Sequence, residues 1–155
     1  MEIQIADNLF IASACNKTAQ AVAINSDTET AVFCTANSLR IGNAYLNGHS
    51  KPTTCVLFIS ASMMVSASED SKLIVWKLID GQWIIHATLV GHSSGIVAIA
   101  VSAIDNIICS SDSSAKIIVW SLKTLEIIQE ITHARHHFLT MSLSHLPNSS
   151  GTTNY

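Results

Sequence analysis

The 155-residue sequence is poor in charge, because Asp, Glu, Lys and Arg make up only 12% of it, about half of the ~25% usual for a soluble domain. It has no cluster of Lys and Arg, which argues against a nucleic-acid-binding surface in this segment. It also lacks any apolar run near the ~20 residues that a membrane-spanning helix needs. So little charge leaves little polar material to cover an isolated globule. We therefore expect other polypeptide to cover part of the surface.

The four cysteines show neither a C-x-x-C pair nor a regular spacing. This pattern favours reduced, buried thiols over a disulfide framework. The chain starts with Met1-Glu2, which is acidic and unlike the basic start of a secretory signal. We expect an intracellular protein, located in the cytoplasm with the nucleus as a second location, and no contact with membranes.

Several short patterns occur twice in the sequence, in the same order and 43 or 44 residues apart. Gly48-His49-Ser50 recurs 43 residues later as Gly91-His92-Ser93, and Ile74-Val75-Trp76 recurs 44 residues later as Ile118-Val119-Trp120. Between these patterns, both copies contain a run of small and β-branched residues that ends in Asp. This period matches the ~40–45 residues of a propeller blade, in which each repeat is a four-stranded sheet.

Local patterns predict four strands in each repeat and no helix. The candidate strands are short and rich in β-branched or aromatic residues, and turn-forming residues separate them. Asp80-Gly81 is a hairpin signal between two of them. The predicted strands cover residues 19–24, 31–35, 38–41 and 44–46, then 55–59, 63–66, 73–78 and 83–89, then 96–101, 107–110, 116–122 and 125–131.

The predicted fold class is an all-β propeller that is incomplete, with about three blades and the start of another. Residues 10–46 form a weak first blade without the Gly-His pair or the Trp, residues 47–90 the second blade and residues 91–132 the third. Residues 133–155, with a strand at 138–143, start a truncated fourth blade. Three blades are fewer than a usual propeller has, so we expect the chain to need the remaining blades or to self-associate.

The Gly-His pairs and the strand tryptophans Trp76 and Trp120 resemble those of WD-repeat proteins. The Asp that follows the Trp in that family is replaced here by Lys77 and Ser121. Three phrases, at residues 14–22, 46–49 and 143–148, further resemble the amino-terminal part of the WD-repeat subunits of Elongator complexes.

This resemblance implies a non-catalytic scaffold with two seven-bladed propellers, of which this chain is the opening piece. Its partners would be the other Elongator subunits, which modify the wobble uridine of certain transfer RNAs. No cofactor is implied. The alternative is another WD-repeat adaptor, acting in signalling or ubiquitin transfer.

The resemblance also implies a buried relay of hydrogen bonds in each full blade. In the second blade its members would be His49, Ser66, Asp70 and Trp76. The carboxylate accepts the imidazole N–H, the imidazole bonds the serine hydroxyl, and the serine oxygen accepts the indole N–H. We expect these residues to have a structural role and not a catalytic one.

In the third blade, His92, Ser110 and Trp120 stand at the matching positions. Counting back from the Trp, however, places Ser114 where the Asp is expected, and Asp112 lies two residues earlier. The second relay is therefore either broken or in need of a β-bulge.

A distant alternative is a serine hydrolase. Gly91-His92-Ser93-Ser94-Gly95 fits the G-x-S-x-G nucleophile elbow, with Asp112 and His133 following in hydrolase order. Residues 96–103 would then form a helix, but their β-branched residues favour a strand. The chain also lacks the succession of βα units of a hydrolase fold. We therefore predict no enzyme and no catalytic residue.

Four histidines near the C-terminus and one tryptophan are the remaining candidates for binding. His133, His136, His137 and His145 suggest a metal by their number, but their spacing matches no zinc site and we predict no metal. Trp83 lies in a predicted outer strand and is the candidate contact for a protein partner.

Overall fold

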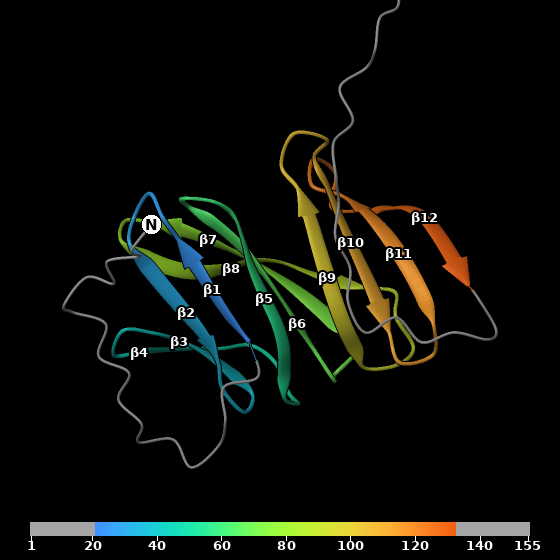
Figure 1. Cartoon of the computed structure of the whole chain (residues 1–155), viewed down its shortest axis with the longest axis horizontal. Coiled ribbons are helices and arrows are strands. Elements are labelled where there is room, and N and C mark those ends of the chain that lie inside the picture. The colour runs from blue at the N-terminus through green and yellow to red at the C-terminus, as the bar shows by residue number, and fades with distance from the viewer. Residues whose placement is uncertain (1–20, 133–155) are drawn as a thin grey trace, which may run out of the picture.

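The computed structural model describes residues 21–132, which form twelve β-strands and no helix. The strands make three four-stranded antiparallel sheets, and in each sheet every strand pairs with the next one along the chain. Figure 1 shows the sheets side by side, with the second between the other two. The predicted all-β class is confirmed. The strands are β1 (Val22–Asn25), β2 (Thr30–Cys34), β3 (Ser38–Ile41), β4 (Ala44–Asn47), β5 (Thr53–Ser60), β6 (Met63–Ser68), β7 (Lys72–Ile79), β8 (Gln82–Val90), β9 (Ile96–Ser102), β10 (Ile107–Asp112), β11 (Lys116–Ser121) and β12 (Ile127–Thr132).

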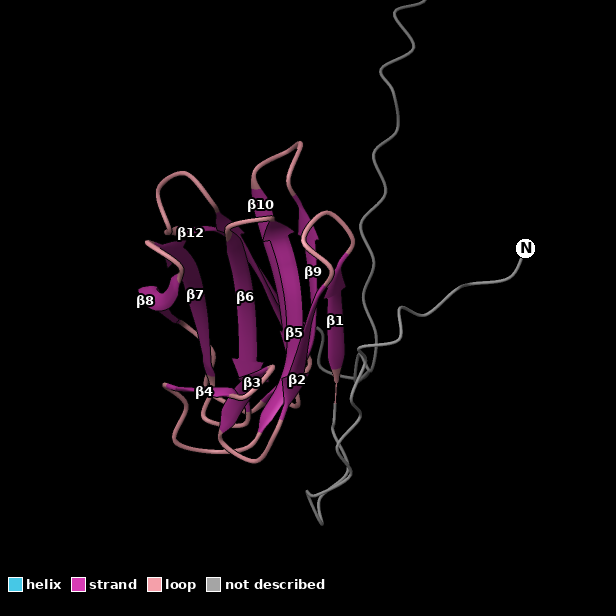
Figure 2. Cartoon of the chain, turned by 90° about the vertical axis from the view of Figure 1, so that its left-hand side faces the viewer, coloured by secondary structure: helices cyan, strands magenta, loops and turns pink. Residues whose placement is uncertain are grey.

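The three sheets are arranged as blades, with the first strand of each sheet innermost. Strand β5 packs against both β1 and β9, so the inner strands of neighbouring sheets lie together. Strands β4, β8 and β12 form the outer edges of their sheets. Figure 2 shows the second sheet crossing the molecule in the order β8, β7, β6 and β5.

The twelve strands predicted before residue 133 are all present, with ends shifted by a few residues. The predicted hairpin at Asp80-Gly81 is confirmed, since both residues have positive φ (50° and 77°) and Ile79 pairs directly with Gln82. The last strand begins at Ile127 and not at the predicted Leu125. Leu125 has φ 61° and its N–H donates to the Ser121 carbonyl, so it belongs to the preceding turn.

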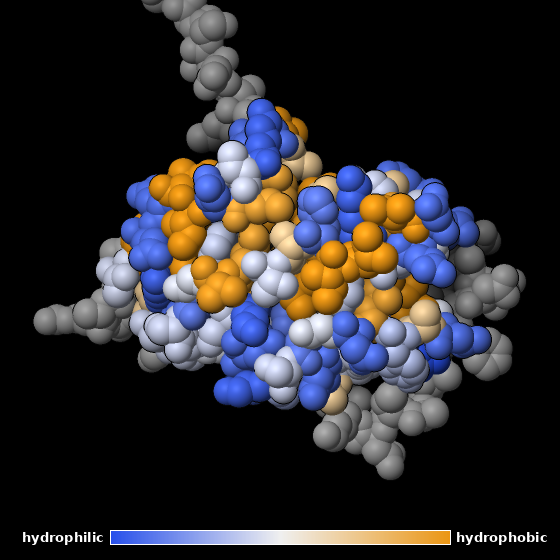
Figure 3. Space-filling model, turned by 180° about the vertical axis from the view of Figure 1, so that it is seen from behind, coloured by the Kyte–Doolittle hydropathy of each residue, from blue (hydrophilic) through white to orange (hydrophobic). Residues whose placement is uncertain are grey.

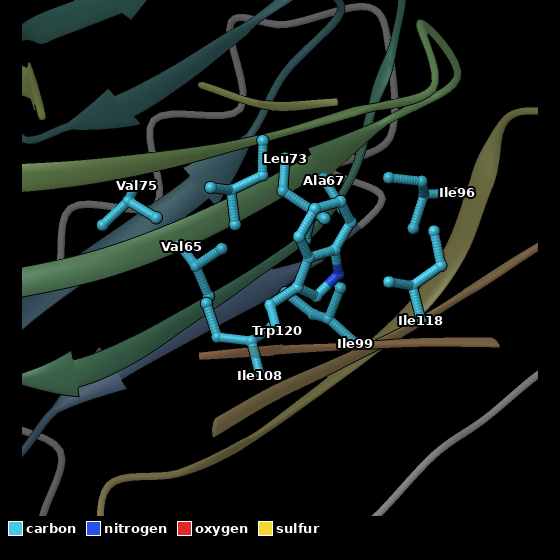
Figure 4. Close-up of a cluster of buried hydrophobic side chains, with 10 residues drawn as sticks. Val65, Ala67, Leu73, Val75, Ile96, Ile99, Ile108, Ile118 and Trp120 are labelled. Atoms are coloured by element: carbon cyan, nitrogen blue, oxygen red, sulfur yellow. The ribbon is translucent and has the colours of Figure 1, made fainter. Parts of the chain in front are cut away.

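The central strands β6 and β7 of the middle sheet are buried on both faces, which explains the continuous apolar runs in their sequence. Along β6, Met64 packs toward the first sheet and Val65 toward the third, as the two-residue period of a strand requires. Figure 4 shows the core between the second and third sheets, where Trp120 of the third sheet lies near Val65 and Leu73 of the second.

The first sheet ends at Asn47, one residue beyond the predicted first blade of residues 10–46, and the strands of the other two sheets lie within the ranges 47–90 and 91–132. The predicted strand at 138–143 and the four C-terminal histidines, His133, His136, His137 and His145, lie outside the described residues. Within residues 21–132 there is no helix that is long and apolar enough to cross a membrane.

Candidate functional site

The second sheet contains a complete relay of hydrogen bonds between buried polar side chains. The Trp76 indole N–H donates to Ser66 Oγ at 2.9 Å, and Ser66 Oγ lies 2.9 Å from His49 Nε2. The other ring nitrogen, His49 Nδ1, lies 3.0 Å from Asp70 Oδ2. Because Ser66 already accepts the indole N–H, its own O–H donates to His49 Nε2, which leaves Nδ1–H to donate to the carboxylate. The sequence therefore named four residues that the structure brings together.

The relay joins the loop before the sheet to three of its elements. His49 lies just before β5, Ser66 in β6, Asp70 in the β6–β7 turn and Trp76 in β7. Asp70 also organises its surroundings, because Oδ2 accepts the N–H of Ser50 and Oδ1 accepts the N–H of Lys72, both at 3.0 Å.

The third sheet repeats this relay without a break. The Trp120 indole N–H donates to Ser110 Oγ at 2.8 Å, and Ser110 Oγ lies 2.7 Å from His92 Nε2. His92 Nδ1 lies 2.8 Å from Asp112 Oδ2. Asp112 is therefore the carboxylate of this relay, and the interpretation that the relay is broken is wrong.

Asp112 reaches His92 because it shares a strand face with Ser110. The two residues lie two positions apart in β10, so their side chains point to the same side of the sheet. Ser114 stands where the first relay has its Asp, but it acts as a donor here: its N–H and its hydroxyl both donate to Asp112 Oδ1, at 2.9 and 2.7 Å. The carboxylate has moved from the turn to the end of the strand.

A β-bulge is present at this point, but it does not explain the different position of the Asp. The pairing of β10 with β9 shifts between Ser111 and Asp112. A shift at the corresponding place occurs in the second sheet, where Thr53 and Cys55 of β5 pair with successive residues of β6. Since the bulge occurs in both sheets, strand alternation and not the bulge brings Asp112 to His92.

Burial and hydrogen bonding set the protonation states of both relays. Burial lowers the pKa of His49 and His92, and the neighbouring carboxylates only partly oppose this effect. Burial alone would raise the pKa of Asp70 and Asp112, but their hydrogen bonds outweigh it and lower both pKa values. Each pair is therefore a neutral imidazole beside a carboxylate, as the donor directions require.

The glycine of each Gly-His pair makes room for the tryptophan of its own sheet. A Cβ on Gly91 would lie 2.9 Å from Cη2 of Trp120 and 2.9 Å from Cδ1 of Ile127. A Cβ on Gly48 would lie 3.0 Å from Cη2 of Trp76. The recurring glycine is thus explained by close packing of the backbone over an indole.

The relays have the hydrogen-bond order of a catalytic triad but not its accessibility. A nucleophilic serine must reach a substrate, whereas Ser66 and Ser110 are 0% exposed and each accepts an indole N–H. The nucleophile-elbow reading also fails, because residues 96–102, which follow Gly91–Gly95, form strand β9 and not a helix. Ser93 is an exposed loop residue, and His133 lies outside the described residues.

Trp83 lies in the outer strand β8, as the sequence predicted, and is half-buried. Its ring meets Phe58 edge-on, with centroids 6.1 Å apart, and both rings pack on the core between the first and second sheets. The structure thus gives Trp83 a packing role. Its contact with a partner stays a prediction.

The described residues offer little for binding metals or small molecules. No group of three or more His, Cys, Asp or Glu within residues 21–132 is arranged to hold a metal ion. The free thiols of Cys34, Cys55 and Cys109 are poor nucleophiles, because burial raises the pKa of each, that of Cys34 to about 12. A hollow of about 300 Å³ lies between the second and third sheets, with Glu69 as its single carboxylate; its walls are Thr54, Glu69, Gly95, Ile96, Val97 and Ser113.

Two residues near the sheet junctions were not found by sequence reasoning. The Thr54 hydroxyl donates to the Ile96 carbonyl at 2.8 Å and so links the second sheet to the third. The neighbouring Thr53 is 0% exposed, and its hydroxyl has no hydrogen-bond partner. Both are ordinary strand threonines in the sequence, so no motif could have singled them out.

Comparison with known proteins agrees with this geometry. The family described as "WD domain, G-beta repeat" matches residues 42–77 and 81–121. Elongator complex protein 2 of Danio rerio is 28% identical over 135 residues, which cover 76% of this chain. The chain spans only 16% of the length of that relative. With two consecutive repeats matched and three blade-like sheets in place, the chain is a WD-repeat protein.

Proposed function

We propose that this chain is part of a non-catalytic scaffold that holds protein subunits together in an Elongator-type assembly. The observation that carries the proposal is that the Ser, His and Asp side chains of the two relays have a structural role. In both relays they are buried and bonded to one another and to a tryptophan. These residues therefore stabilise the sheets, and we expect the function of the sheets to be the binding of other proteins on their surface.

The outer strands supply a surface suited to protein partners. Ile84 and Ile85 of β8 are 43% and 45% exposed, and Ile127 and Ile128 of β12 are 40% and 58% exposed. Figure 3 shows apolar surface on the side of the molecule seen from behind. Exposed apolar side chains on the outer strands of a chain with only 12% charged residues are typical of a contact with other polypeptide.

The finer proposal is a role in transfer-RNA modification together with the other Elongator subunits, in the cytoplasm and the nucleus. Its support is the relative named Elongator complex protein 2 and the resemblance of three short phrases in the sequence. The role belongs to the full-length assembly, since the chain matches 16% of that relative.

The test is native purification of the tagged protein from its own cells, followed by mass spectrometry of what co-purifies and measurement of wobble-uridine modification. The proposal expects the catalytic Elongator subunit in the purified complex. It also expects modification to be lost when the gene is deleted and restored by the wild-type gene. Recovery of ubiquitin-ligase or signalling subunits, with unchanged transfer RNA, would instead establish the adaptor alternative.

Two surface variants show whether the outer strands carry the contact. Ile84→Asp combined with Ile128→Asp should reduce the recovered subunits at least threefold while the level of the protein stays the same. Ile104→Asp is the matched control, because Ile104 is 74% exposed but lies in the β9–β10 turn, away from the outer strands. Equal recovery with both would contradict the assignment of the contact to β8 and β12.

A further inference from the structure

We draw no further inference here: the strongest candidate, the exposed face of the β1–β4 sheet on which Val22, Phe33, Arg40 and Tyr45 lie in one cross-strand row, is the face opposite the one that packs on the second sheet, and nothing in the structure shows what covers it.

Discussion

Replacing Asp112 by Ala tests the assignment of the third-sheet carboxylate directly. The substitution removes the acceptor of the His92 Nδ1–H, which lies 2.8 Å from Asp112 Oδ2 with both side chains 0% exposed. It also removes the acceptor of the N–H groups of Ser114 and Lys116, at 2.9 and 3.1 Å. The imidazole donor is buried, so water does not easily replace the lost carboxylate.

The size of the effect follows from these contacts. A buried donor left without a partner costs about 1–3 kcal/mol, and the partly exposed N–H groups add up to about 1 kcal/mol because water reaches them. Asp112→Ala should therefore lower the free energy of unfolding by about 1–4 kcal/mol. Asp112→Asn should cost less, because the amide oxygen still accepts the imidazole N–H.

Ser114→Ala is the matched control, since Ser114 stands where the second sheet has its relay Asp. Its hydroxyl is an exposed donor to Asp112, so we expect a loss below about 1 kcal/mol. Urea unfolding followed by tryptophan fluorescence measures both, at matched concentration because association would couple to unfolding. The reasoning would be refuted by equal losses in the two variants, or by a loss below about 1 kcal/mol for Asp112→Ala.

Four further predictions concern the relay histidines, Thr53, Gly91 and the association of the chain. The relay histidines have pKa values below the ordinary 6.5, so the unfolded chain binds more protons than the folded chain. The urea concentration at the unfolding midpoint should therefore decrease as the pH is lowered from about 7.5 to about 5.5, and a flat profile would contradict this. Thr53→Val removes an unpartnered buried hydroxyl and should raise the free energy of unfolding by about 0.5–1.5 kcal/mol, and a comparable loss would refute it. Gly91→Ala places a methyl group against an indole and should cost about 1–3 kcal/mol in urea unfolding, whereas Gly42→Asn, with φ 56° and open space around it, should cost little. Light scattering at about 20 μM should show association, because Val22 and Ile24 are 49% and 68% exposed on a sheet face; a stable monomer would exclude it.

The sequence predicted the sheets well because each signal was local. The Asp80-Gly81 pair predicts a hairpin and the β-branched runs predict strands, in each case from a few neighbouring residues. The 43-residue recurrence of Gly-His then aligns one sheet with the next. The first relay could be named because the spacing of its residues matches the pattern of the WD-repeat family.

The second relay could not be settled, because its carboxylate departs from that spacing. Counting residues from Trp120 favours Ser114, whereas the three-dimensional answer depends on which side of β10 each side chain faces. Ser110 and Asp112 alternate with Ser111, so both point toward His92. Contacts between sheets, such as that of Thr54 with Ile96, leave no trace in the local sequence at all.

The relays have a consequence for how such a chain can be lengthened or rearranged. Each relay draws all its members from a single stretch, residues 49–76 in one case and 92–120 in the other, and neither crosses into a neighbouring sheet. A duplication that begins just before Gly48 or Gly91 therefore copies a complete relay together with its glycine. A new chain end at either place likewise leaves both relays intact. A duplication boundary between β9 and β10 would instead place His92 and Ser110 in different units, and neither unit would contain a complete relay. Gene duplication can therefore add whole repeats of this fold that begin at the glycine, and each added repeat contains its own complete relay.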